Sequence, residues 1–219
     1  MRFLFSLFVK ITGWPAYFLA FRKKVYYEDK KAQSRRIKGK AIVISNHHTV
    51  MDYALMLYVF YGRLLRCQIA ELMFKRNPFF TFLLKGLGGI KVDRDAHDFS
   101  FIGKSLKILE RGGVVEIFPE ARIPKAGEQK PLPFKPSAAY IALHGDAPII
   151  PVYLTDGYFK KQRARVIIGK PIYVKEYYND TLSEKENLEI ISGKLRAKVV
   201  ELKYELERQI EEKNKKKTR

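Results

Sequence analysis

Two histidines and an aspartate stand close together in segment 45–52, whose sequence is SNHHTVMD. An imidazole titrates near neutral pH, so it can take the proton from an attacking hydroxyl and contribute roughly 10² to 10⁴ in rate. Asp52 follows His47 by five residues, and its carboxylate can reach back over a first helical turn to hold the imidazole tautomer. His48, four residues before Asp52, fits the same role. The segment therefore favours general-base chemistry on a substrate hydroxyl, which needs no nucleophile from the enzyme.

The same segment has a purely structural interpretation. Thr49 and Asp52 have the spacing of a capping box, in which the threonine side chain caps a helix and the acidic side chain three positions later bonds back to the threonine backbone N–H. A capping box is common and catalytically silent. On these residues alone, both interpretations stay open.

The elements that would position these side chains alternate between strand and helix from residue 41 onward. Short β-branched runs predict strands at 41–45, 89–93, 114–118, 149–154 and 166–168. Helical periodicity predicts helices at 53–61, 99–111 and 137–143. This alternation predicts an α/β layered domain with a largely parallel central sheet flanked by helices. The histidine segment falls where the first of these strands gives way to the first helix, a place where catalytic side chains often lie.

The first 21 residues are rich in Phe, Leu, Trp and Tyr. A narrow polar stripe runs along this greasy helix at helical spacing: Arg2, Ser6, Lys10 and Gly13. Lys10 divides the apolar material into runs shorter than the roughly 20 residues that span a bilayer, and Pro15 should bend or end the first helix. We expect an amphipathic segment that lies in the membrane interface. A transmembrane span, a signal peptide and a buried core helix are the competing interpretations.

Positive charge dominates the chain. Lys and Arg number 42 against 23 Asp and Glu, a net charge of +19, and nine basic residues lie between positions 22 and 40. Such an excess draws a protein toward anionic lipid headgroups or nucleic acid, and charge alone does not choose between them. Basic attraction would reinforce the apolar insertion of the first helix.

One cysteine, Cys67, excludes an intramolecular disulfide and a cysteine-based zinc cluster, and we interpret it as a small buried hydrophobe. Residues 183–213 form one predicted charged helix with an apolar face: Leu188, Ile191, Leu195, Val199, Leu202 and Leu206. We expect three parts: an interfacial segment with a basic linker at 1–40, a catalytic domain at 41–182, and a helix with a basic tail at 183–219, packed on that domain.

Four blocks in order resemble the glycerolipid acyltransferase family, which includes bacterial 1-acyl-glycerol-3-phosphate acyltransferases. The segment from Asn46 to Asp52 resembles the His-x4-Asp motif of the family. The other blocks are GIKVDR at 89–94, FPE at 118–120 and APIIPV at 147–152. The resemblance covers roughly 41–171, and the ordered set is far more specific than any one block.

This resemblance implies that His47, not His48, is the general base, with Asp52 as its orienting acid. It also implies that Arg94 contacts the acceptor phosphate. A guanidinium at a strand end can grip phosphate oxygens through two charge-assisted hydrogen bonds. The alternative for Arg94 is an ordinary surface arginine.

Three more residues receive roles from the resemblance. Glu120 would position the acceptor through its glycerol hydroxyls, Arg122 would add a second positive charge, and Lys135 would assist. The alternative for Glu120 is a loop carboxylate that bonds nearby amides.

The chain departs from the family pattern in two places. The third block usually continues with Gly, a small hydroxyl residue and Arg, whereas here Glu120 is followed by Ala121 and at once by Arg122. If this position needs a positive φ, Ala121 costs about 1 to 2 kcal/mol, and the loop shape or the acceptor differs. Glu71 stands where members often carry lysine.

The resemblance therefore implies transfer of a fatty acyl group from acyl-CoA or acyl carrier protein to a lysophospholipid, 1-acylglycerol-3-phosphate above all, to give phosphatidic acid. We expect no metal or organic cofactor, no nucleic-acid partner, and a peripheral or monotopic location on the cytoplasmic face of the cell membrane. The alternatives are another acceptor, hydrolysis of the thioester by water, and a basic lipid-binding or nucleic-acid-binding module without catalysis.

Overall fold

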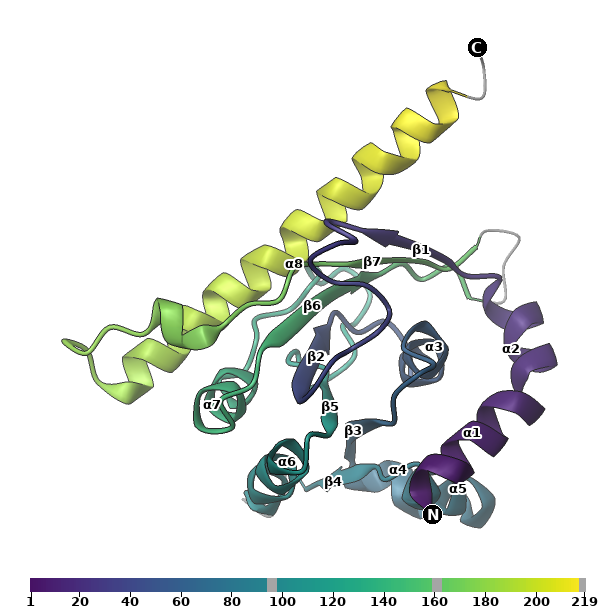
Figure 1. Ribbon diagram of the computed structural model, residues 1–219, viewed down its shortest axis with the longest axis horizontal. Coiled ribbons are helices and arrows are strands. Elements are labelled where there is room, and N and C mark those ends of the chain that lie inside the picture. Colours follow the sequence, from purple (N-terminus) through teal and green to yellow (C-terminus); the bar gives the residue numbers. More distant parts are fainter. Residues whose placement is uncertain (94–97, 159–162, 217–219) are drawn as a thin grey trace.

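The computed structural model describes residues 1–93, 98–158 and 163–216, and in this part of the chain seven strands form one sheet between two layers of helices (Figure 1). The strands are β1 (Lys24–Tyr27), β2 (Ala41–Ser45), β3 (Leu65–Ala70), β4 (Ile90–Val92), β5 (Val114–Ile117), β6 (Ile149–Leu154) and β7 (Arg165–Ile168). The helices are α1 (Arg2–Thr12), α2 (Trp14–Phe21), α3 (Asp52–Val59), α4 (Glu71–Lys75), α5 (Pro78–Gly86), α6 (Ser100–Glu110), α7 (Ser137–His144), a 3₁₀ turn (Val174–Tyr177) and α8 (Glu184–Lys215).

The sheet has the order β1-β7-β6-β2-β5-β3-β4. Neighbouring strands are parallel except β6 and β7, which run antiparallel. Every residue of β2 and β5 is buried, as expected for central strands of a parallel sheet covered on both faces. The predicted α/β fold with a largely parallel sheet is thus confirmed.

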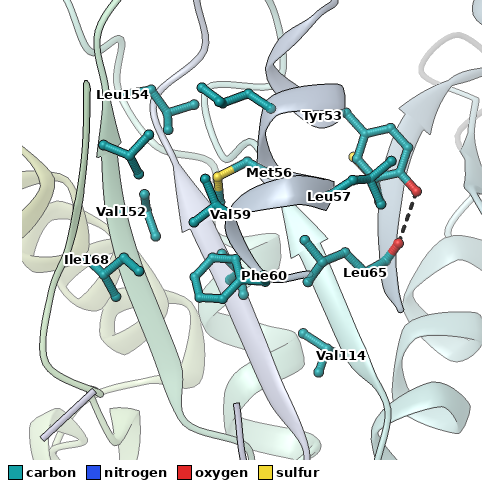
Figure 2. Packing of buried hydrophobic residues seen from close by; sticks show 14 of the residues in the cluster. Tyr53, Met56, Leu57, Val59, Phe60, Leu65, Val114, Val152, Leu154 and Ile168 are labelled. Atoms are coloured by element: carbon teal, nitrogen blue, oxygen red, sulfur yellow. Dashed lines mark hydrogen bonds between the residues drawn. The ribbon is translucent and has the colours of Figure 1, made fainter. Parts of the chain in front are cut away.

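The two faces of the sheet carry separate hydrophobic cores. On one face, α3 packs its apolar side chains against the central strands and is joined by residues of α2 and α5. Figure 2 shows Met56 of α3 and Phe60, which directly follows α3, among Val152 and Leu65 of the strands. The Tyr53 hydroxyl also donates a 3.0 Å hydrogen bond to the Leu65 carbonyl oxygen. Because α3 begins at Asp52, this packing also fixes where the histidine segment lies.

The other face is covered by α6, α7 and the first half of α8. The side chains predicted to share the apolar face of α8 are all buried, and Leu202 and Leu206 pack further along against Tyr26 of β1 and Ile167 of β7. A capping box starts α8: the Ser183 side chain accepts from the Glu186 backbone N–H, and the Glu186 carboxylate accepts from the Ser183 backbone N–H. The last turns of α8 extend away from the sheet (Figure 1).

Five elements were not predicted: β1, β3, α4, α5 and the 3₁₀ turn. The short strand β1 pairs with β7, so the expected linker at 1–40 contains an edge strand of the sheet. In β3 the polar Arg66 and Gln68 interrupt the apolar run, while Leu65 and Cys67 face the core. α5 begins at Asn77 and Pro78, a helix-start signal present in the sequence.

In the N-terminal helices, polar side chains face the protein and large apolar side chains face outward, the reverse of an ordinary surface helix. The predicted polar stripe of α1 faces the protein: Ser6 and Lys10 are buried, and the Lys10 Nζ donates to the carbonyl oxygens of Tyr61 and Arg63 at 3.0 and 2.8 Å. Burial lowers the pKa of Lys10 to about 8. Large apolar side chains point outward instead: Phe3, Leu4, Leu7, Phe8, Ile11, Trp14, Phe18 and Leu19. A buried core helix is therefore the wrong interpretation of this segment.

The first helix ends near the expected place. α1 stops at Thr12, α2 begins at Trp14, and Pro15 lies in the first turn of α2. Within the described residues no single helix is long and apolar enough to cross a membrane, although α1 and α2, bent by 60° to each other, meet the length and composition criteria as a pair.

Candidate active site

His47 and Asp52 meet at the carboxyl end of β2. The His47 Nδ1 lies 2.6 Å from Asp52 Oδ2. The backbone N–H groups of His48 and Thr49 donate to the same oxygen at 2.6 and 3.0 Å. Two amide donors mark Asp52 as an acceptor, so Nδ1 of His47 carries the proton and Nε2 is left to accept one.

Asp52 is fully buried, whereas the His47 side chain is 17% exposed. The imidazole is held on its flat side by Phe118, whose ring centroid lies 4.3 Å away at an interplanar angle of 22°. The histidine is therefore fixed in orientation by a carboxylate and a ring, while one edge remains accessible to a substrate.

Only half of the predicted capping box forms, since the Asp52 carboxylate accepts from the Thr49 backbone N–H at 3.0 Å but the Thr49 hydroxyl does not accept from the Asp52 backbone N–H. Asp52 is the first residue of α3, preceded by Met51 without a side-chain cap, so it is not three positions inside the helix. The Thr49 hydroxyl accepts instead from the Met51 backbone N–H at 3.0 Å. Because Asp52 stands at the helix start, its carboxylate can turn back toward the histidine loop.

His48 points elsewhere. Its Nε2 lies 2.9 Å from the Leu154 carbonyl oxygen and 2.7 Å from the Asn46 side-chain nitrogen. Asn46 in turn exchanges hydrogen bonds with the Leu154 backbone at 2.8 and 3.0 Å. Asn46 and His48 thus tie the end of β2 to the end of β6 and brace the loop that carries His47.

Glu120 joins the histidine loop to a more distant loop. Its two carboxylate oxygens accept from the backbone N–H groups of His47 and Leu132, both at 2.7 Å. The side chain is buried, and burial raises the pKa of its carboxyl, an effect that the two amide hydrogen bonds oppose. Glu120 therefore sets the backbone of the candidate base, and both of its oxygens are engaged by the protein itself.

Ala121, next to Glu120, has φ of +60°, in the left-handed region that favours glycine. The sequence raised this possibility from the missing glycine of the third block. Ala121 therefore carries backbone strain at the wall of the site.

Two cavities meet beside His47. The smaller, about 240 Å³, has His47 in its wall and is otherwise mainly apolar. The larger, about 580 Å³, shares four lining residues with it: Gln68, Ala70, Phe118 and Ala121. Apolar side chains from β3, α4, α5 and the loop after Ala121 line the smaller cavity: Ile69, Met73, Phe80, Leu84 and Ile123. Sequence analysis named none of them, because a pocket formed from four separate segments leaves no local pattern.

The remaining predicted site residues are spread around these cavities. Arg122 lines the smaller cavity and pairs through both guanidinium nitrogens with Glu128, at 2.7 Å each, which raises the Arg122 pKa. Lys135 is exposed and lines the larger cavity. Arg94 lies outside the described residues. The structure thus brings His47, Asp52 and Glu120 together and places Arg122 and Lys135 on adjoining walls.

Glu71, the second departure from the family pattern, lies at the start of α4. Its carboxylate pairs with Lys91 at 3.0 Å and Lys75 at 3.1 Å. Cys67 is buried as expected, and burial raises the pKa of its thiol. In the described part of the chain, no group of three or more His, Cys, Asp or Glu side chains is placed to hold a metal ion.

Comparison with known proteins identifies relatives of this chain. The acyltransferase family model matches residues 24–155. The 1-acyl-sn-glycerol-3-phosphate acyltransferase of Bacillus subtilis (strain 168) is 31% identical over 137 residues, 60% of this chain and 66% of that protein, so the chain spans just under two thirds of that relative.

A solved structure shares the architecture. The crystal structure of the 1-acyl-sn-glycerophosphate (LPA) acyltransferase PlsC from Thermotoga maritima superposes with a TM-score of 0.60 at 18% identity, and the match covers 92% of this chain and 95% of that one. At this identity the likeness concerns the fold. The family model covers more than half of the chain and includes His47, Asp52 and Glu120, so the protein belongs to the acyltransferase family.

Proposed function

We propose that the protein transfers a fatty acyl group from the thioester of acyl-CoA or acyl carrier protein to the free hydroxyl of a lysophospholipid, with 1-acylglycerol-3-phosphate as the acceptor and phosphatidic acid as the product. One observation carries this proposal. In a chain of the acyltransferase family, His47, which lies 2.6 Å from the buried Asp52, forms part of the wall of an apolar cavity.

The proposed chemistry needs one base. The acceptor hydroxyl oxygen attacks the thioester carbonyl carbon while its proton passes to Nε2 of His47. Asp52 stabilises the resulting imidazolium through Nδ1. The tetrahedral intermediate collapses with cleavage of the carbon–sulfur bond, and the imidazolium returns the proton to the leaving thiolate. The products are an ester and a free thiol, and the histidine is regenerated.

The smaller cavity suits the acyl chain. Its walls are apolar apart from a few groups near His47, so a hydrocarbon chain gains by leaving water there. Val50 and Ile123, which line it, are 47% and 37% exposed, so apolar side chains also mark its mouth. The carbonyl carbon of a bound thioester would then lie near the His47 edge.

The acceptor headgroup would bind on the adjoining walls. Lys135 on the larger cavity supplies one positive charge for the phosphate, and we keep Arg94 as the phosphate ligand that the family resemblance implies. Arg122 supplies charge only if Glu128 yields part of its pairing. Since both oxygens of Glu120 already bind backbone amides, we assign Glu120 to positioning His47.

The enzyme would work at a membrane. The exposed apolar faces of α1 and α2 continue into α5 through the edge-to-face contact of Phe5 and Phe82, whose centroids lie 5.5 Å apart. α5 also contributes Phe80 and Leu84 to the smaller cavity, so the proposed acyl site adjoins the apolar surface. Both donors are cytosolic, which assigns the protein to the cytoplasmic face.

The first experiment follows the product. Labelled acyl-CoA and lysophosphatidic acid are supplied on vesicles to the wild type, to His47→Ala and to His144→Ala. His144 on α7 is the matched control, because it is a partly exposed histidine that pairs with Glu184 at 3.5 Å and packs against the ring of Tyr140. We expect phosphatidic acid from the wild type and the control, and a rate lower by on the order of 10² to 10⁴ for His47→Ala.

Two outcomes would contradict the proposal. Equal rates for the wild type and His47→Ala would exclude His47 as the base. Release of free fatty acid without a diacyl product would make the protein a thioester hydrolase. Circular dichroism of His47→Ala shows whether a lost rate reflects lost folding.

A further inference from the structure

A cationic cleft of about 660 Å³ lies away from the candidate active site, between β4, α4, α5 and α6 and the start of α1. Six of its basic side chains have no carboxylate partner within the described residues: Arg2, Arg66, Lys85, Lys104, Lys107 and Arg111. Its one acidic side chain, Glu71, is already paired with Lys75 and Lys91. The cleft therefore holds a large uncompensated positive charge.

The basic side chains of the cleft lie close enough for their charges to shift the pKa of a neighbour. Burial lowers the pKa of the Arg66 guanidinium, and the charges of Arg2 and Arg111 lower it further. The stem of Arg66 lies against Gly88, where an added Cβ would come within 3.4 Å of Arg66 Cγ. A fold that holds repelling cations together gains when an anion binds between them, and phosphate oxygens suit arginine and lysine best.

The cleft is separate from the catalytic cavities but adjoins the apolar surface. The two cavities lie on different sides of α5: Phe80 and Leu84 line the His47 cavity, whereas Thr81 and Lys85 line the cleft. Lys85 lies one turn after the exposed Phe82. At its other end, Arg2 opens α1 directly before the exposed side chains Phe3 and Leu4. The cations thus border the face that would enter a membrane.

We propose that this cleft binds the phosphate of an anionic phospholipid headgroup in the membrane surface, and so holds the enzyme with its apolar face in the bilayer. The inference rests on the membrane association in the proposed function, and it assigns that attraction to a defined site. A soluble nucleotide phosphate, such as that of coenzyme A, has the same chemistry but no reason to lie beside exposed phenylalanines.

The test is vesicle flotation in a His47→Ala background, so that turnover has no part in it. Vesicles of phosphatidylcholine alone are compared with vesicles containing phosphatidylglycerol. The cleft variant is Lys85→Gln/Lys107→Gln, and the matched control is Lys31→Gln/Lys38→Gln, two exposed lysines of the basic segment 22–40. A second cleft variant, Arg66→Met, keeps the stem that packs on Gly88.

We expect both cleft variants to lose affinity for the anionic vesicles, the double variant by about tenfold or more, and the control to lose about threefold or less. Affinity for phosphatidylcholine should change in none of them. Equal losses in the control and the cleft variants would mean diffuse attraction and overturn the proposal. Binding of adenosine 3′,5′-bisphosphate that the cleft variants lose, with vesicle binding unchanged, would assign the cleft to a soluble ligand.

These outcomes separate the cleft from the reaction. If no vesicles bind any variant, the membrane association itself fails and this proposal fails with it. If the product assay fails while flotation still distinguishes the cleft from the control, the headgroup site stands without the proposed acyl transfer.

Discussion

Asp52 accepts hydrogen bonds from two backbone amides and lies 2.6 Å from the imidazole of His47. Asp52 begins α3, and its carboxylate also holds the backbone of the loop that carries His47. Glu120 acts on the same loop from the other side, at the His47 backbone N–H. The candidate base is thus fixed through its backbone, through Nδ1 and through its ring face on Phe118. Such bracing keeps a catalytic group close to its working geometry.

Ala121 is held in a strained backbone conformation. Its φ of +60° suits glycine, so Ala121→Gly relieves the strain while it adds freedom to the unfolded chain. We expect a net gain in the free energy of unfolding of roughly 0.5 to 1 kcal/mol. Urea denaturation measures it. Ala126→Gly, at a nearby exposed alanine without a positive φ, is the control and should lower stability. A loss of stability in both variants would show that Ala121 is unstrained.

Glu116 is fully buried in β5, and neither of its carboxylate oxygens has a hydrogen-bond partner within the described residues. Burial raises the pKa of Glu116 well above its ordinary value of 4.5, and the Asp52 carboxylate adds to the shift. The folded state therefore keeps a proton that the unfolded chain loses. Between the two pKa values the native state binds more protons, so stability falls as the pH rises above about 4.5.

Glu116→Gln cannot titrate, so it escapes this loss. We expect the free energy of unfolding of Glu116→Gln, relative to the wild type, to increase as the pH rises above about 4.5. Urea unfolding of both proteins at each pH gives the difference, in which the other titrating groups cancel. A difference that is constant with pH would show that the Glu116 carboxyl ionises equally easily in both states.

Among the elements, α1 and α2 reverse the usual orientation of an amphipathic surface helix. Lys10, in the polar stripe, fastens α1 to the loop after α3, and the aromatic side chains face outward. Gly13 allows this close packing, because a Cβ there would come within 2.7 Å of the Tyr58 hydroxyl. A soluble surface rarely carries so large a contiguous apolar face, which favours a membrane partner.

This orientation predicts which side chains insert. Phe8→Ser/Trp14→Ser should reduce flotation on phosphatidylcholine vesicles at least tenfold, since each buried aromatic ring contributes on the order of 2 kcal/mol. Both residues are more than half exposed, so the fold should survive the change. Tyr204→Ser on α8, a comparably exposed aromatic, is the control. Unchanged flotation of the double variant would place the membrane contact elsewhere.

At the scale of the whole molecule, the net charge of +19 combines with the apolar face. Salt shortens the Debye length from about 10 Å at 0.1 M to about 3 Å at 1 M, so electrostatic attraction weakens while apolar insertion does not. We expect binding to phosphatidylglycerol vesicles to fall over this range toward the level seen with phosphatidylcholine, and binding to phosphatidylcholine to persist. Flotation across the salt series checks it. Complete release from both vesicle types at high salt would leave the apolar face without a role in binding.

The sequence by itself determined the α/β class, nine of the strands and helices to within two residues at either end, and the spacing of His47 and Asp52. These features depend on local periodicity and on contacts a few residues apart, which a single chain displays directly. The α5 start at Asn77 and Pro78 was equally local, and the prediction omitted it. The left-handed conformation of Ala121 was raised as a possibility by the family pattern, in which a glycine usually follows this block.

The residues by themselves left both histidines open and the family resemblance favoured His47, and the tertiary structure then showed that His47 faces Asp52. Only the tertiary structure decided where the carboxylate of Glu120 points and which side of α1 packs on the protein. His47 and His48 have nearly the same sequence distance to Asp52, and it is the carbonyl oxygen of Leu154, 106 residues from His48, that draws His48 away. The Glu120 carboxylate is directed by amides 73 and 12 residues distant. A helix with one polar and one apolar side has two ways to face a core, and the buried partners of Lys10 settle the choice. Each of these outcomes depends on groups that become neighbours only when the sheet has formed.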